Sequence, residues 1–134
     1  MLAPALETVR LTLHVLAASI WVGGQIVMTG MIGPARGLGG DAPKTLARAF
    51  SRLAWPAYGV LVITGFWNLS TFHWASQSGA WKAVFLAKLV VVAAAGVGAA
   101  LHARSTSRAA LAVWGSVAGV ASIAALAMGV LLAG

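Results

Sequence analysis

The sequence predicts an all-α membrane protein, a bundle of four transmembrane helices in which residues 1–134 form a single domain. Of the 134 residues, 60% are hydrophobic, only 8% are charged, and the mean hydropathy is +0.92. In a soluble domain about a quarter of the residues are charged. The apolar residues also form runs of roughly 20 residues, the length needed to cross the hydrocarbon core of a bilayer. A lipid bilayer is therefore the expected partner of nearly the whole chain.

The predicted spans follow one another with short connections. Gly33-Pro34 is expected to end the first span, and Asp41 followed by Pro43 favours the start of the next helix. That helix begins as a basic amphipathic segment before it enters the membrane. A polar and aromatic loop at residues 70–80 precedes the third span. The four predicted spans are residues 11–32, 53–69, 81–101 and 109–132.

The positions of Lys and Arg predict the orientation of the chain. They concentrate in the turns after the first and third spans, and cytoplasmic loops carry the excess of basic residues. Both termini and the loop at residues 70–80 are therefore expected on the outer side. The net charge of +7 comes from basic residues at the ends of the spans, where the orientation of the chain in the membrane explains them. Nucleic acid is therefore not an expected partner. The residues expected to form an interfacial basic stripe are Lys44, Arg48, Arg52, Arg104 and Arg108.

The residue types present exclude several kinds of chemistry. The chain has no cysteine, which excludes disulfides, thiolate ligands and cysteine nucleophiles. Glu7 and Asp41 are its only carboxylate side chains. Acid–base catalysis by a pair of carboxylates is therefore not expected. No catalytic residue is therefore predicted, and a metal or cofactor would depend mainly on histidine.

The first span carries polar side chains along one helical stripe. His14, Ala18, Trp21 and Gln25 recur at i, i+4, i+7 and i+11, which places them on one face of a helix. Polar groups in a bilayer turn toward the protein interior, because exposure to hydrocarbon costs free energy. We expect this stripe to face other helices. His14 is interpreted either as a ligand or as a hydrogen-bonding group between helices, with Trp21 and Gln25 as supporting residues.

Three further residues bear on the identity of this site. His73 lies in the outer loop, either as a second ligand beside His14 or as an exposed residue. His102 lies about 25 Å from His14 along the membrane normal, at a rise of 1.5 Å per residue, and is expected at the inner interface. Lys88 lies within the third span, where it either snorkels outward or supports the His14 site. Two imidazoles suit a copper ion or, as axial ligands, haem b.

Small residues recur in the last span. Gly115 and Gly119 form a Gly-xxx-Gly pattern, and Ser122 follows almost one turn later. Small residues at this spacing let helix backbones approach closely in lipid. They are expected to pack the bundle or, in a homo-oligomer, a second copy of the chain.

Several motifs together resemble the copper-resistance D (CopD) family of integral membrane proteins. The resemblance runs in order along nearly the whole chain. It implies a multi-pass protein of the bacterial cytoplasmic (inner) membrane that takes part in copper uptake or homeostasis, often beside a periplasmic copper carrier. The motifs are His14-x6-Trp21-x-Gly23-Gly24, Phe50-Ser51-Arg52-Leu53-Ala54, Leu61-Val62-Ile63-Thr64-Gly65 and Leu86-Ala87-Lys88-Leu89.

Two alternatives to copper handling stay open. A more distant likeness is to small bacterial membrane haem proteins of the protoporphyrinogen-oxidase type, which pair a first-helix histidine with a later lysine, here His14 and Lys88. This likeness implies a haem b protein for electron transfer or porphyrin oxidation. The other alternative is an accessory subunit that packs against a larger membrane complex through its small-residue faces.

Overall fold

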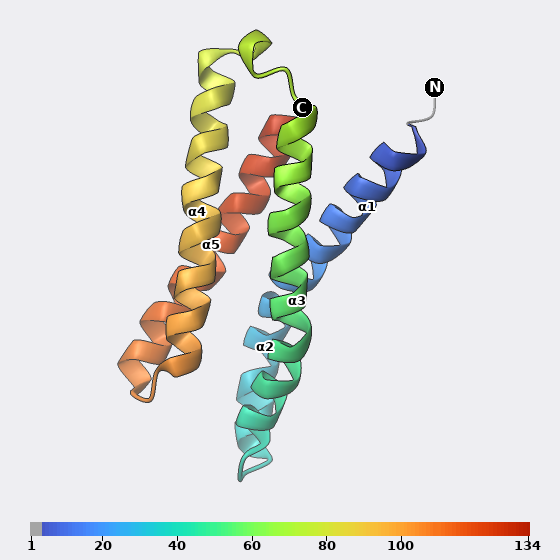
Figure 1. Ribbon diagram of the computed structural model, residues 1–134. Coiled ribbons are helices and arrows are strands. Elements are labelled where there is room, and N and C mark those ends of the chain that lie inside the picture. Colours follow the sequence, from blue (N-terminus) through green and yellow to red (C-terminus); the bar gives the residue numbers. More distant parts are fainter. Residues whose placement is uncertain (1–3) are drawn as a thin grey trace. The chain divides into compact units, whose positions relative to one another are not determined.

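The computed structural model describes residues 4–134, and every regular element in this part of the chain is helical (Figure 1). The all-α prediction is confirmed. The helices form two compact units, of which the first ends at Phe72 and the second comprises His73–Gly134. Each unit is an antiparallel helical hairpin, and the two are described separately below. That they form one domain stays a prediction.

The first hairpin is built from one long bent helix and a straighter partner. Leu38–Asp41 join them in a tight turn, where Gly39 and Gly40 adopt φ values of +76° and +57° that favour glycine. Asp41 stands at the predicted N-cap of the second arm, but its carboxylate makes no cap hydrogen bond and lies 3.9 Å from the Lys44 ammonium. The elements are α1 (Ala5–Ala18), the π turn η1 (Ser19–Gly23), α2 (Gly24–Gly37) and α3 (Ala42–Thr71).

The prediction that Gly33-Pro34 ends the first helix is wrong. Pro34 lies inside α2, which continues to Gly37. Proline lacks the N–H that would bond to the carbonyl four residues earlier, but the turn after it is closed by Leu38 N–H donating to Ala35 O at 3.2 Å. One missing bond near an exposed helix end is therefore tolerated.

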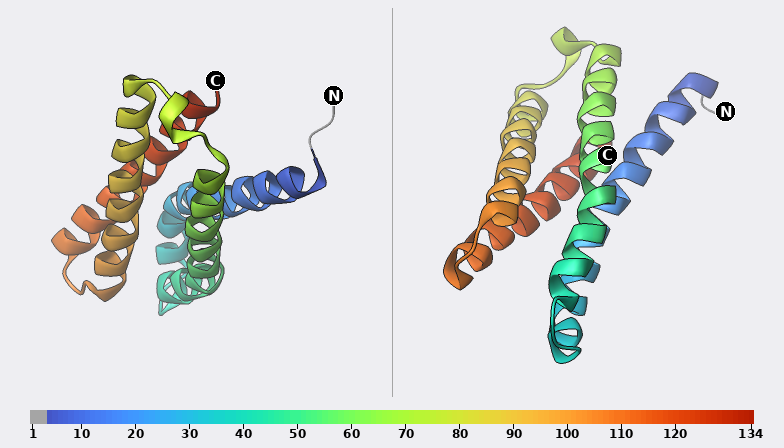
Figure 2. Two further views of the ribbon diagram at one scale, coloured as in Figure 1. Left: turned by 45° about the horizontal axis from the view of Figure 1, so that its top comes forward. Right: turned by 60° about the horizontal axis from the view of Figure 1, so that its bottom comes forward.

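The first arm of this hairpin bends at η1. A π turn holds one more residue than an α-helical turn and is a recognised cause of helix bending. The left view of Figure 2 shows the change of direction between α1 and α2. At this turn two successive side chains, Trp21 and Val22, are both buried. The bend therefore brings a large aromatic ring into the interface with α3.

The second hairpin packs through small residues. The two helices approach closely at Gly98, where an added Cβ would lie 3.0 Å from the Ala118 backbone nitrogen. Gly119, in the predicted packing pattern, has no atom within 4 Å of its Cβ position. The elements are η2 (Trp74–Ser76), α4 (Gly79–Arg104) and α5 (Arg108–Ala133). The buried residues of α4 and α5 are Ala95, Gly96, Gly98, Ala118 and Ser122.

Among the described residues, three helical stretches are long and apolar enough to cross a membrane, which indicates a membrane protein. They are Ala5–Gly37, Gly79–Arg104 and Arg108–Ala133. Large apolar side chains such as Val90 and Val120 are exposed on these helices, as lipid contact requires. α3 has 30 residues, but its basic start and its run Trp55-Pro56-Ala57-Tyr58-Gly59 lower its hydropathy. That α3, which contains the predicted second span, residues 53–69, crosses the membrane stays a prediction.

Candidate functional site

The predicted site residue His14 lies in the interface between α1 and α3. Its Nδ1 is 2.7 Å from Oγ1 of Thr64, which belongs to α3. The Thr64 hydroxyl also lies 2.6 Å from the carbonyl oxygen of Val60, one turn earlier in the same helix. Thr64 is 2% exposed, whereas His14 is half-buried. The imidazole is therefore held between helices and does not point at lipid.

The hydrogen bonds of Thr64 indicate which tautomer the neutral His14 ring adopts. A threonine hydroxyl has one hydrogen, and the Val60 carbonyl can only accept it. The hydroxyl oxygen then accepts the hydrogen bond from the Nδ1–H of His14, so in the neutral ring the lone pair is on Nε2. Histidines that bind metals usually have their second nitrogen held by a hydrogen bond in this way. Sequence reasoning missed Thr64, although this polar residue stands in the apolar run Leu61–Gly65.

The predicted supporting residues Trp21 and Gln25 lie on the same side of the helix as His14. Trp21 is 4% exposed, and its ring centroid is 4.6 Å from that of Tyr58 and 5.6 Å from that of Trp55. Gln25 Nε2 donates to the Trp21 carbonyl at 2.9 Å. Trp21 thus belongs to an aromatic cluster with α3, while the Gln25 amide supports the π turn. Of the predicted stripe, His14 and Trp21 contact α3; that Gln25 faces another helix stays a prediction.

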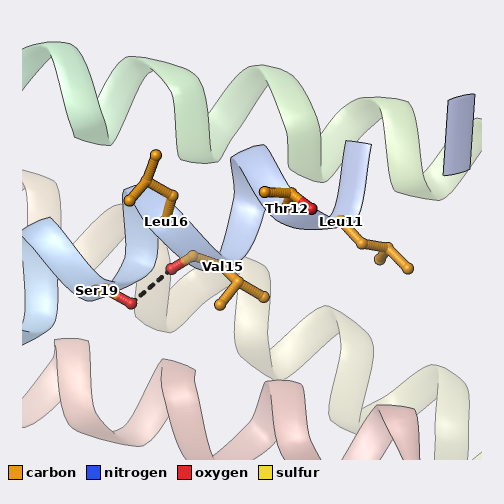
Figure 3. A pocket seen from close by; sticks show the side chains of 5 residues that line it. All are labelled: Leu11, Thr12, Val15, Leu16 and Ser19. Carbon is orange, nitrogen blue, oxygen red and sulfur yellow. Dashed lines mark hydrogen bonds between the residues drawn. The ribbon is translucent and has the colours of Figure 1, made fainter. Parts of the chain in front are cut away.

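A shallow hollow lies on the exposed side of α1 (Figure 3). It is lined by Leu11, Thr12, Val15, Leu16 and Ser19. Two of these side chains, Thr12 and Ser19, carry hydroxyl groups. The Ser19 hydroxyl donates to the Val15 carbonyl at 2.8 Å, which satisfies it within its own helix. His14 does not line this hollow, so it is not the predicted pocket. Its apolar lining is suited to acyl chains.

His73 and Lys88 belong to the second unit. His73 is exposed before η2, and its carbonyl accepts from the Ser76 hydroxyl at 2.8 Å. The half-buried Lys88 lies against α5, where an added Cβ at Gly129 would be 3.1 Å from its Nζ. The Trp81 indole N–H donates to the Leu132 carbonyl at 3.4 Å.

The Trp81–Leu132 bond and the close contact of Gly98 with Ala118 show which residues of α4 and α5 lie opposite each other. By this register the Lys88 backbone lies about one turn of α5 away from Gly129. The ammonium thus runs toward the end of the hairpin that holds Trp81, as expected for a snorkelling lysine. Support of His14 by Lys88 and pairing of His14 with His73 stay predictions.

His102 connects the two helices of the second hairpin. Its Nδ1 donates to the Leu111 carbonyl at 2.8 Å, and the ring occupies the space left by the missing side chain of Gly115. The residue is exposed at the end of α4, where the sequence placed it. The hydrogen bond to α5, which gives His102 a structural role, was not predicted. The residues of the predicted interfacial stripe are all exposed, namely Lys44, Arg48, Arg52, Arg104 and Arg108.

The described part of the chain contains no group of three or more histidine or carboxylate side chains placed to hold a metal ion. The site in the first hairpin therefore offers one oriented imidazole, a hydroxyl and an aromatic cluster. Comparison with protein-family models, curated proteins and solved structures gave no match.

Proposed function

We propose that this chain is a copper-handling protein of the bacterial cytoplasmic membrane that binds copper through the Nε2 atom of His14. The observation that carries the proposal is the hydrogen bond from His14 Nδ1–H to Thr64. It fixes the ring and leaves the lone pair on the other nitrogen, which is the atom a metal needs. Imidazole is a good copper ligand, and the absence of cysteine from the sequence removes the competing thiolate sites.

In this proposal α3 also crosses the membrane, as the second of four spans, and the His14 end of the first hairpin faces outward. With 30 residues, α3 is about 45 Å long at 1.5 Å per residue, enough to cross the bilayer after a basic start at the inner interface. Both termini then lie outside. His73, in the segment that follows α3, is the proposed second ligand, and copper would arrive from the outer side, for example from a periplasmic carrier.

A haem b protein is the second candidate, and one observation favours it. A single oriented imidazole is sufficient as a haem axial ligand, whereas a copper ion needs further donors, and the described part of the first hairpin groups no other histidine or carboxylate pair around His14. When bound, haem would supply one-electron chemistry. His14 would hold it, and Thr64 would fix the orientation of the ring.

The two candidates are separated by an optical spectrum and a metal analysis of the purified protein. Copper retained by the wild type and by His102→Ala, but lost in His14→Ala, supports the proposal. A Soret band that disappears only in His14→Ala would establish haem and overturn copper. His102→Ala is the matched control, because this imidazole also donates through Nδ1 but lies in the other hairpin. A wild type with neither copper nor haem overturns both candidates.

A further inference from the structure

One face of α3 carries three basic side chains along its first turns. Lys44, Arg48 and Arg52 recur every four residues, which places them in one stripe along the helix, and all three are exposed. The opposite side of α3 packs inside the hairpin. Ala57, which follows Arg48 by about two and a half turns, is buried, and the buried Thr64 bonds to α1. The basic stripe therefore points away from the packed side of α3.

The hairpin does not neutralise this stripe. The chain has two carboxylate side chains, Glu7 and Asp41. Asp41 Oδ1 lies 3.9 Å from Lys44 Nζ, with the two side chains 85% and 78% exposed, and an ion pair this exposed is weak. Glu7 lies in the first turn of α1, at the far end of the first arm from α3's basic start. Arg48 and Arg52 therefore present their charges to whatever lies outside the hairpin.

The same face becomes aromatic and then apolar further along α3. Trp55 follows Arg48 by seven residues, about two turns, and is 39% exposed. Its ring packs edge-on against Trp21, with the centroids 5.6 Å apart. Phe66 follows Arg48 by about five full turns and is 62% exposed. A helix that passes from lipid headgroups through the interface into acyl chains shows this order of basic, aromatic and apolar side chains.

We propose that this face of α3 binds anionic phospholipids of the cytoplasmic leaflet. The lipid phosphates accept from the guanidinium groups of Arg48 and Arg52, and Lys44 adds to the attraction of the negatively charged leaflet. An acidic protein would match the basic stripe, but it would leave the exposed aromatic and apolar continuation unexplained. The inference rests on the proposed topology, in which α3 crosses the membrane, and is independent of His14, copper and haem.

The test compares two phospholipids that differ in net charge. Phosphatidylglycerol is an anion, whereas phosphatidylcholine has a phosphate but no net charge. The full chain is reconstituted into vesicles of equal parts of both lipids and extracted into detergent, and the lipids retained per protein are counted by native mass spectrometry. We expect the wild type to retain phosphatidylglycerol preferentially. A basic residue at an anionic surface changes affinity about fivefold, so Arg48→Gln and Arg52→Gln should each lower the preference by about that factor.

A double variant in the other hairpin is the matched control. Arg104→Gln/Arg108→Gln removes as much charge as Arg48→Gln/Arg52→Gln, but its two exposed residues belong to different helices and form no stripe along one face. The control should keep the preference for phosphatidylglycerol that the α3 double variant loses. Equal retention of both lipids by the wild type overturns the proposal. Equal losses in the two double variants overturn it as well, because retention would then follow net charge and not the face of α3. Copper measured on the same samples tests the proposed function separately.

Discussion

Replacing Thr64 by valine tests the central contact of the candidate site. Valine has nearly the shape of threonine, so the variant removes the acceptor of the His14 N–H, at 2.7 Å, without creating a cavity. In membrane proteins such bonds contribute about 0.6 kcal/mol on average and about 1.7 kcal/mol at most. Thr64 is 2% exposed, so no solvent replaces the lost acceptor. We therefore expect a value near the upper end, about 1–2 kcal/mol.

The measurement is a double-mutant cycle. Wild type, Thr64→Val, His14→Leu and the double variant are unfolded reversibly in mixed detergent micelles, and helix content is followed by circular dichroism. Thr64→Ser, which keeps the hydroxyl, should retain most of the coupling between the two positions. If the free energies of the single variants add within about 0.5 kcal/mol, the two residues are independent, and the assignment of the lone pair to Nε2 loses its basis.

The remaining predictions concern ligand binding and two glycines. If His14 binds copper, Thr64→Val should weaken binding about 10–100-fold in a copper titration; unchanged affinity would contradict this. Gly24→Ala should destabilise the first hairpin by about 1–3 kcal/mol in thermal unfolding, because the added methyl would meet the Phe50 ring; stability equal to wild type would refute that contact. Gly115→Ala should displace the His102 ring, which an NMR titration detects as an altered imidazole signal.

Gly23→Ala is the matched control for Gly24→Ala. No atom lies within 4 Å of the Cβ position of Gly23, and alanine is favoured over glycine in a helix by about 1 kcal/mol. The control variant should therefore be at least as stable as the wild type. The two substitutions differ by one position in the chain, so equal effects would show that Phe50 does not pack against Gly24.

Most of the fold followed from hydrophobicity and helix signals. The predicted third and fourth spans, residues 81–101 and 109–132, lie within α4 and α5, and His14 and Trp21 contact α3 as expected. These features depend on local composition and on the helical period. The π turn was not predictable in the same way, since one inserted residue is stabilised by packing of Trp21 against α3 and leaves no distinct pattern in the sequence.

The partner of His14 was also beyond sequence reasoning. Thr64 lies 50 positions away, and pairing it with His14 requires the register of two antiparallel helices. Sequence reasoning also gave Arg10 no role in a site. Its unpaired Nε becomes visible only when side-chain burial is known, because burial of a single atom is a property of packing and not of residue type.

The two hairpins pack by different chemistry, and this difference indicates where the function lies. The core of α4 and α5 is made of alanine, glycine and Ser122, whose hydroxyl bonds to Ala118 in its own helix. Close backbone contact holds the middle of this hairpin, and the hydrogen bonds of His102 to Leu111 and of Trp81 to Leu132 join its helices near their ends. The interface of α1 and α3 instead contains an imidazole, a guanidinium and an amide, which are costly groups to keep within a membrane. The first hairpin is therefore where the proposed ligand would bind.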